Sequence, residues 1–259
     1  MSPFRTRYRI FDEYLITRRP QAFLQFIKLL PDEFEDLYES LGGRLEHFRE
    51  EVLYDSWLLR SLRSIFAYVT QGKSFSAFAL DIGMGVSTAA AIVKEVTEAI
   101  LIVLHRRALP RLTRGKLRQV AEMTQERFDY PRAVGFLDGK HILIKKPKRS
   151  DSAYYNYQHY HSIILLALCD CENRIMAYDV GSPGRLSDAG VFRSSELKRF
   201  LDTHDGIFPP TEDLGTVGPV QYHILVNGGF GQGLRFIRPY TEREATTRDK
   251  RLFNRKLSG

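Results

Sequence analysis

Apolar residues recur every three or four positions through the first half of the chain. This spacing is clear in QAFLQFIKLLPDEFEDLYESL (21–41) and in SWLLRSLRSIFAYVTQG (56–72), and it is typical of helices that bury one face. The pattern ends near residue 130, and no Gly/Ser-rich linker follows it. We therefore predict an all-helical region over residues 1–130.

One segment of this region has the pattern of two helices joined by a turn. SFSAFALDIGMGVSTAAAIVKEVTEAI (74–100) predicts a short helix, a glycine turn over 83–85 and a second helix with Ser87 or Thr88 as its N-cap. This is the order of a helix-turn-helix DNA-binding unit. The second helix offers Lys94 but no arginine for base contacts, so a plain helical hairpin is an equal alternative.

Residues 131–259 carry the pattern of strands instead. The apolar and β-branched runs lie at 134–144, 162–170, 174–182 and 223–226. The last run stops at Asn227-Gly228. This dipeptide is either a two-residue hairpin turn, or an amide at the strand end where a nuclease site needs a carboxylate. We expect an α/β domain over residues 131–259.

Composition excludes several classes of protein. Of the 259 residues, 43% are hydrophobic, which is enough for one substantial core and a smaller one. No run approaches the roughly 18 apolar residues of a membrane span, and MSPFRTRYRIFDEYL at the start lacks a signal-peptide core. Cys169 and Cys171 stand too close in CDC for an unstrained disulfide. We expect no membrane segment, no secretion, and free thiols in a reducing compartment.

The charge of the chain permits nucleic-acid binding without requiring it. The net charge is +7 and the pI is near 9.4, with basic residues concentrated in KHILIKKPKR (140–149) and RDKRLFNRK (248–256). Solvated faces explain such clusters as well as phosphate contacts do. The aromatic residues of YYNYQHYH (154–161) follow the first cluster, and they either stack on bases or pack at a strand edge.

Two acidic residues are candidates for metal-dependent chemistry. Asp138 interrupts a strand in GFLDGKHI, and Asp188 precedes a predicted helix in GRLSDAGVF. Cleavage of a phosphodiester by divalent metal ions needs several carboxylates, because hard cations prefer oxygen ligands. Simpler roles stay open for both residues, since Asp before Gly favours a turn and Ser187 or Asp188 caps the helix.

Other polar residues of the strand region have weaker claims. His141, His159 and His161 are candidates for a metal cluster. His159 and His161 share one face of a predicted strand, but the pattern offers no third ligand near them, so a structural or DNA-facing role is favoured. Asp170 is predicted to serve a hairpin turn. Asp179 is a weak candidate for a substitute metal ligand.

Four motifs in one order carry a family resemblance. They are VGFLDGKHILIKKP, SAYYNYQHYHSIILLALCD, DVGSPGRLSDAGVF, and RPY followed by LFNRKLS. Over residues 20–259 the chain resembles PIF/Harbinger-type DDE transposases and their domesticated nuclease relatives. The resemblance implies an RNase H-like mixed sheet flanked by helices, preceded by an all-helical region with a helix-turn-helix-like unit.

The resemblance also implies a catalytic site. Asp138 matches the first catalytic Asp of the family and Asp188 matches the second, and both would bind Mg²⁺ or Mn²⁺ in a two-ion site. The count back from Pro239 places Asn227 where the family has a further Asp, and Gly228 where a Glu often follows. An amide keeps one oxygen ligand but removes a negative charge, so we expect weakened metal binding and failure of two-ion catalysis.

A second departure concerns the end of the sequence. Relatives continue after the FN..LS motif into a helix with a further acid, whereas this sequence ends at Gly259. We expect a C-terminally truncated domain and a metal-dependent endonuclease or strand-transfer activity that is weak or lost. The alternative is an inactive, domesticated DNA- or protein-binding module.

DNA is the partner that the resemblance implies. The residues expected to contact it are Lys140, Lys145, Lys146, Lys148, Arg149, Tyr155 and Arg185. A separate Myb-like DNA-binding partner protein is also implied. We expect nuclear localisation, and a cytoplasmic fraction is compatible with the sequence.

Overall fold

The chain forms two compact units, Met1–Ala108 and Leu109–Gly259, here called the N-terminal and C-terminal units. The structure is a computed structural model that describes residues 20–42, 62, 65–66, 68–70, 72 and 74–258. Most of the predicted helix over 56–72 lies outside the described residues. No helix in the described part of the chain is both long and apolar enough to span a membrane.

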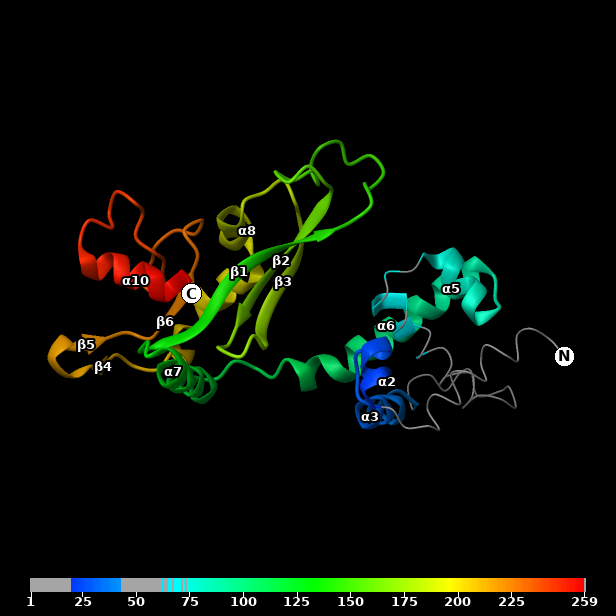
Figure 1. The fold of residues 1–259 in the computed structure, drawn as a ribbon, viewed down its shortest axis with the longest axis horizontal. Coiled ribbons are helices and arrows are strands. Elements are labelled where there is room, and N and C mark those ends of the chain that lie inside the picture. Colours follow the sequence, from blue (N-terminus) through cyan, green and yellow to red (C-terminus); the bar gives the residue numbers. More distant parts are fainter. Residues whose placement is uncertain are drawn as a thin grey trace. The chain divides into compact units, whose positions relative to one another are not determined.

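The N-terminal unit is helical in its described part. Its helices are α2 (Pro20–Ile27), α3 (Pro31–Gly42), α5 (Phe75–Ile82) and α6 (Val86–Ala108) (Figure 1). Their apolar faces share one core, which includes Phe34, Leu41, Phe78, Ile92 and Val96. The three- to four-residue spacing of the sequence therefore produces helices that pack on one another.

The predicted helix, turn and helix are present at α5 and α6. Ser74 caps α5 by accepting a hydrogen bond from the N–H of Ala77. Gly83 ends the helix in the left-handed region at φ 70°, where a residue without a Cβ is unstrained. The prediction of Ser87 or Thr88 as the next N-cap is wrong, because α6 already begins at Val86. The turn is short enough for the helix to start directly after it.

The C-terminal unit is built on a five-stranded mixed sheet. Its strands are β1 (Ala133–Leu143), β2 (Ser162–Cys169), β3 (Ile175–Pro183), β6 (His223–Val226) and β7 (Phe236–Ile237). The order is β3-β2-β1-β6-β7 (Figure 1). β2 is antiparallel to β1 and β3, whereas β6 is parallel to β1 and to β7. The sheet thus changes from antiparallel to parallel pairing at β1.

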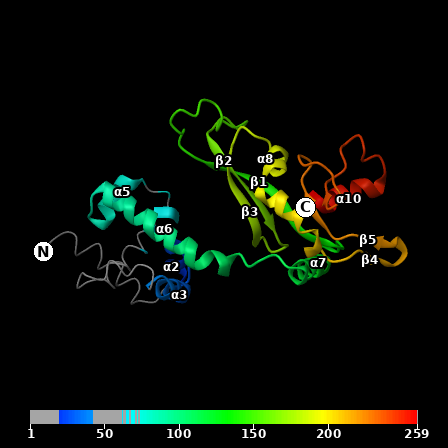
Figure 2. The same cartoon turned by 180° about the vertical axis from the view of Figure 1, so that it is seen from behind.

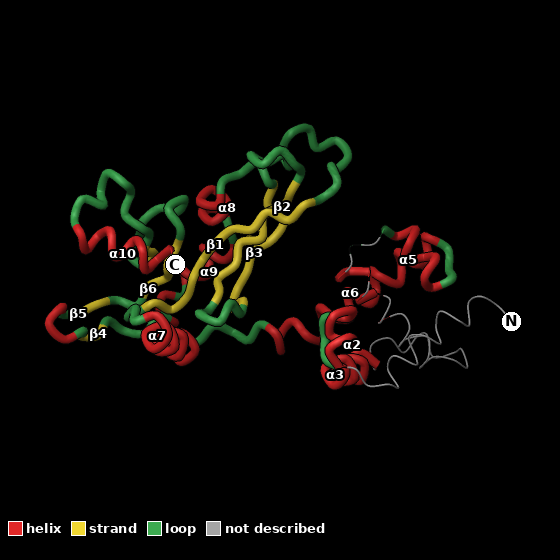
Figure 3. Tube along the Cα trace, viewed as in Figure 1, coloured by secondary structure: helices red, strands yellow, loops and turns green. Residues whose placement is uncertain are grey.

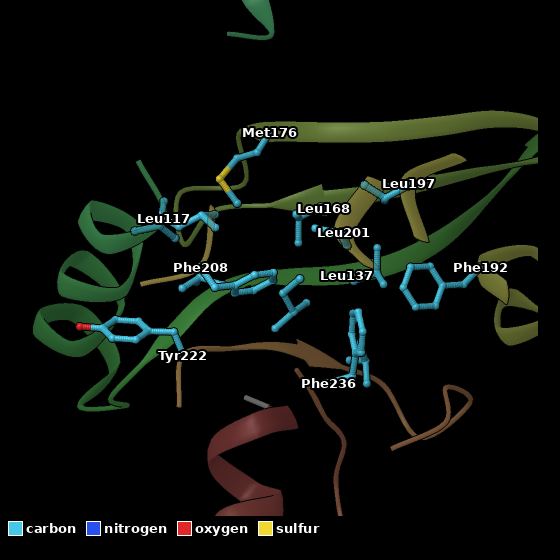
Figure 4. Packing of buried hydrophobic residues seen from close by; sticks show 14 of the residues in the cluster. Leu117, Leu137, Leu168, Met176, Phe192, Leu197, Leu201, Phe208, Tyr222 and Phe236 are labelled. Atoms are coloured by element: carbon cyan, nitrogen blue, oxygen red, sulfur yellow. The ribbon is translucent and has the colours of Figure 1, made fainter. Parts of the chain in front are cut away.

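Three helices share one hydrophobic core with this sheet. They are α7 (Arg114–Phe128), α8 (Asp188–Ser194) and α9 (Glu196–Thr203). α8 packs against β2 (Figure 2), and α9 packs against β3 (Figure 3). Side chains from the helices and strands converge in Figure 4, among them Leu117, Leu137, Leu168, Phe192 and Leu201. In β2, alternate side chains are buried and half-buried, as expected for a strand with one covered face.

Smaller elements complete the C-terminal unit. A two-stranded sheet pairs β4 (Glu212–Asp213) with β5 (Pro219–Val220). The helix α10 (Arg248–Ser258) contacts the unit through Phe253, whose ring lies 5.4 Å from that of Tyr240. Asn254 of α10 also exchanges two hydrogen bonds with the backbone of Tyr240. The basic segment 248–256 is therefore a docked helix.

The boundary between the units lies earlier than the change of pattern near residue 130. α7 is helical, but its buried residues Leu117, Val120 and Ala121 belong to the core of the sheet. A helix that covers a sheet has the same sequence pattern as one in a helical bundle, which explains the difference. Cys169 and Cys171 are free thiols.

Candidate active site

Asp138 lies in the middle of β1, at the point where this strand leaves the core. Leu137 before it is buried, whereas Asp138 is exposed. The parallel neighbour β6 pairs with β1 through Leu137 and Val226, and it ends there. The residues that follow this pair, Asp138 and Asn227, are therefore adjacent at one edge of the sheet.

Asn227 is held between two partners of opposite polarity. Its Oδ1 accepts a hydrogen bond of 2.8 Å from the N–H of Gly229, and its Nδ2 donates one of 2.8 Å to Oδ1 of Asp138. A backbone N–H only donates and a carboxylate only accepts, so these partners fix which side of the amide is oxygen. The amide therefore presents its donor group to Asp138.

The hairpin interpretation of Asn227-Gly228 is wrong. β6 and β7 are parallel, so no two-residue hairpin joins them. Neither Asn227 nor Gly228 has the positive φ that such a turn requires. The segment is instead an Asx turn, closed by the bond from Gly229 and by a bond from the N–H of Phe230 to the carbonyl of Asn227.

Asp188 approaches the same edge of the sheet from the start of α8. The N-cap of this helix is Ser187, whose Oγ accepts a bond of 3.2 Å from the N–H of Gly190, so Asp188 is not the capping residue. Its carboxylate rests on the backbone of Gly139, because a Cβ at that position would lie 2.3 Å from Oδ1 of Asp188. Gly139 thus provides the space that brings Asp188 next to β1.

The two carboxylates interact electrostatically. Burial, followed by the charge of Asp138, raises the pKa of Asp188, and His141 opposes this rise. Two anionic groups at one edge of a sheet repel each other, and a cation placed between them would relieve the repulsion. The pair consequently has the electrostatic character of a cation site.

The metal-ligand set is smaller than the resemblance implies. Within the ranges that the structure describes, no group of three or more His, Cys, Asp or Glu side chains is arranged to hold a metal ion. Asp138 and Asp188 supply carboxylates, which are the ligand type that hard divalent ions prefer. The third position is filled by the amide of Asn227, whose oxygen is already bonded to the backbone.

Two other aspartates of the sheet have structural roles. Oδ2 of Asp179 accepts a bond of 2.8 Å from the N–H of Glu196 at the start of α9, which is the contact of a helix-capping group. Asp170 accepts bonds from the backbone of Glu172 and from the backbone and side chain of Arg174. Burial would raise the pKa of Asp170, but these bonds hold it below the ordinary value. The predicted turn role of Asp170 is therefore seen in the structure.

Most of the residues predicted to bind DNA lie in or beside the connection between β1 and β2. All of them are exposed: Lys140, Lys145, Lys146, Lys148, Arg149, Tyr155 and Arg185. No ion pair involves any of these cations among the residues described. We call Lys145, Lys146, Lys148 and Arg149 the basic patch. Its charges are free to bind phosphates, whereas Lys256 of α10 is paired with Asp129.

Two of the remaining three residues of the set, Tyr155 and Arg185, are ordered by local contacts. Nη1 of Arg185 donates a bond of 2.8 Å to Oγ of Ser152, which ties the segment before α8 to the loop after the basic patch. The ring of Tyr155 is 42% exposed and packs edge-on against His161 at 5.2 Å. The packing interpretation of the aromatic run therefore holds for Tyr155, and base stacking stays a prediction.

A buried polar chain beside Asp188 is absent from the sequence-based predictions. Nδ1 of His141 lies 2.9 Å from Oγ of Ser162, which also accepts a bond of 2.9 Å from Nδ2 of Asn156. Ser162 is fully buried and Asn156 nearly so. The sequence signal was the presence of small and polar residues inside otherwise apolar or aromatic runs.

A pocket of the C-terminal unit is next to this edge but has a different character. It has a volume of about 520 Å³ and lies between α8, α9 and the segment 230–236. Its walls include the rings of Phe192, Phe230 and Phe236. Neither Asp138 nor Asn227 lines it, so we place the chemistry at the carboxylates and not in the pocket.

Comparison with known families relates this edge of the sheet to an endonuclease family. A family model described as DDE superfamily endonuclease matches residues 137–259. The matched residues include Asp138, Asp188 and Asn227. No curated protein and no solved structure matches the chain.

Proposed function

We propose that the C-terminal unit is a transposase-derived, DNA-binding endonuclease domain of the Harbinger type, in which Asn227 impairs divalent-metal-dependent cleavage. The observation that carries the proposal is the bond of 2.8 Å from Nδ2 of Asn227 to Oδ1 of Asp138. The DDE superfamily match supports the reaction class. The strand order β3-β2-β1-β6-β7, with β1 central, supports an RNase H-like assignment.

The amide of Asn227 competes with a metal ion for the carboxylate of Asp138. Oδ1 of Asp138 accepts bonds from the backbone N–H of Gly139 and from Asn227, both at 2.8 Å. A carboxylate oxygen has two lone-pair directions, and both are used by these donors. A metal ion at this carboxylate would have to use the other oxygen or displace the amide. An Asp at position 227 would instead offer a further anionic oxygen.

Two of the expected ligands are suited to a single ion. Asp138 and Asp188 would hold Mg²⁺ or Mn²⁺ through their carboxylates. When bound, such an ion polarises a phosphate oxygen and lowers the pKa of a water ligand. The chain's own cations have the separate task of binding the DNA backbone, which the basic patch and Arg185 can do without metal. DNA binding would therefore survive the loss of cleavage.

The alternative function is an inactive module that binds DNA or protein. The unpaired, exposed cations of the basic patch favour DNA over protein as its ligand. The turn between α5 and α6 is compatible with a DNA-reading unit, but Glu95 and Glu98 on α6 place acidic charge near Lys94, and Lys94 pairs with Glu98. Sequence-specific DNA binding would then depend on a separate Myb-like partner, and we place the protein in the nucleus with its substrate.

Metal titration tests the proposal. Isothermal calorimetry with Mn²⁺ should give weak binding to the native protein, tighter binding to Asn227→Asp/Gly228→Glu, and none to Asp138→Ala. A Cβ at Gly228 would meet no atom within 4 Å, so the second substitution adds no clash at that carbon. Equal Mn²⁺ affinity of the native protein and the double variant would refute the role given to Asn227.

A further inference from the structure

The polar chain beside Asp188 unites the motifs that carry the family resemblance. DGKHI contributes His141, YYNYQ contributes Asn156, HSI contributes Ser162 and GRLSDAGVF contributes Gly184. Gly184 packs so closely on Ser162 that a Cβ would lie 2.0 Å from its Oγ. Segments far apart in the sequence are thus brought to one hydroxyl, which indicates a built site with a role beyond general packing.

Hydrogen-bond polarity can be followed along this chain from its fixed end. Oδ1 of Asn156 accepts bonds from the backbone N–H groups of Gln158 and Tyr160, at 3.0 and 3.2 Å. Backbone N–H groups only donate, so the oxygen of the amide must face them. The NH₂ group of Asn156 therefore faces Ser162 and donates to its Oγ at 2.9 Å.

The next step sets the proton of the imidazole. Oγ of Ser162 has one proton to donate. Among the described residues, its hydrogen-bond partners are Nδ2 of Asn156, which donates, and Nδ1 of His141 at 2.9 Å, which can accept this proton. Ser162 is fully buried, and a buried hydroxyl is nearly always hydrogen-bonded. Nδ1 then acts as an acceptor, and the neutral ring carries its proton on Nε2.

His141 is positioned for contact with a substrate. It lies two residues after Gly139 on β1, so both project from the same face of the strand. Gly139 contacts the carboxylate of Asp188, which places His141 beside that group. The ring of Tyr157 packs edge-on against the imidazole at 5.5 Å and restrains its plane. Nε2 has no partner among the described residues.

We propose that His141 is a substrate-contacting residue, whose Nε2–H donates a hydrogen bond to a non-bridging oxygen of the DNA phosphodiester beside Asp188. The inference rests on the proposed function. Asn156 and Ser162 are positioning residues, which act through the imidazole by fixing where its proton lies. An oriented donor supplements the lysines of the basic patch, because its direction is set before DNA binds.

An isosteric variant reverses the polarity of the chain without removing a side chain. In Asn156→Asp one carboxylate oxygen still accepts from Gln158 and Tyr160, but the other can only accept from Ser162. The hydroxyl proton then points to residue 156, and Nδ1 of His141 must become the donor. Long-range ¹⁵N–¹H NMR at alkaline pH should show Nε2–H in the native protein and Nδ1–H in Asn156→Asp.

DNA affinity provides the second measurement. Fluorescence anisotropy with a short duplex, without metal, should show about tenfold weaker binding for His141→Phe and Asn156→Asp, as expected for one hydrogen bond to a charged oxygen. Gln158→Glu is the matched control, because it adds the same charge in the same loop and leaves the amide of Asn156 unchanged. Its affinity should fall less than that of Asn156→Asp.

The outcomes separate this inference from the proposed function. A native ring with its proton on Nδ1, or a tautomer that Asn156→Asp does not change, overturns the polar chain. A switched tautomer with a loss of affinity no greater than that of Gln158→Glu overturns the phosphate contact. Failure of the native protein to bind DNA refutes the proposed function and the contact together, whereas the tautomer result still stands by itself.

Discussion

Replacement of Asn227 by Asp should destabilise the metal-free protein, and Mn²⁺ should restore its stability. In the native protein, Nδ2 of Asn227 donates a hydrogen bond to Oδ1 of Asp138 at 2.8 Å. Asn227→Asp removes this bond and places a second carboxylate oxygen at the same distance from Asp138. The bond to Gly229 is kept, because that group faces the oxygen of the amide. The change is therefore confined to the contact with Asp138.

The size of the effect follows from this geometry. A hydrogen bond to a charged group contributes about 1.5–3 kcal/mol, and the lower value applies because Asp138 and Asn227 are exposed. Two unit charges about 2.8 Å apart repel by about 1.5 kcal/mol in water. The sum is about 3 kcal/mol, or a fall in Tm of about 6 to 12 °C for a domain of this size.

Differential scanning fluorimetry with and without Mn²⁺ measures this effect. Asn227→Ala should lose the hydrogen bond without adding repulsion, so its loss of stability should be smaller and Mn²⁺ should stabilise it less than it stabilises Asn227→Asp. The exchange variant Asp138→Asn/Asn227→Asp restores an amide next to a carboxylate and should regain most of the stability without metal. The reasoning is refuted if metal-free Asn227→Asp melts at the native temperature, or if Mn²⁺ stabilises Asn227→Asp and Asn227→Ala equally.

Three further predictions concern groups around this site. Burial and the charge of Asp138 raise the pKa of Asp188 above its ordinary value of 3.8. The protonated carboxyl therefore stabilises the fold at low pH, and this stabilisation is lost as the pH rises through the raised pKa. Asp188→Asn should therefore raise the Tm of the metal-free protein at neutral pH, and an unchanged or lower Tm would contradict the assignment. Replacement of the four residues of the basic patch by Ala should make the binding constant for DNA less sensitive to salt. The slope of log K against log salt concentration should fall in magnitude by up to about 3.6, at about 0.9 per phosphate contact. An unchanged slope would exclude the patch from the interface. Asp170→Asn should lower the free energy of unfolding in urea by about 2–3 kcal/mol, because its buried carboxylate accepts three bonds, and a loss under half of that would show that the turn does not need the charge.

The strands were the most predictable part of the fold. The run 162–169 alternates in the structure between buried and half-buried positions, and the strand-forming residues of β1, β2, β3 and β6 were recognisable without tertiary information. The place of α7 was not, because its apolar stripe fits a helical bundle as well as a sheet. The choice depends on which surface is available, and the sequence of one helix does not contain that information.

The candidate site was predictable to the extent that strand ends and a helix start define it. Asp138 and Asn227 become neighbours because β6 ends where Val226 pairs with Leu137 of β1, and Gly139 makes room for Asp188. The direction of the amide of Asn227 could not be predicted, since it depends on the N–H of Gly229. The same is true of Ser162, whose partners come from three separate segments.

The central claim is that an amide in place of a carboxylate has suppressed metal-dependent cleavage on an intact scaffold. Nicking of supercoiled DNA in Mn²⁺ tests it most directly, with the native protein, Asp138→Ala and Asn227→Asp/Gly228→Glu compared at equal DNA occupancy. The account predicts that the native protein nicks no faster than Asp138→Ala and that the double variant nicks measurably faster than both. Nicking by the native protein that disappears in Asp138→Ala would contradict it, because the amide would then be compatible with catalysis.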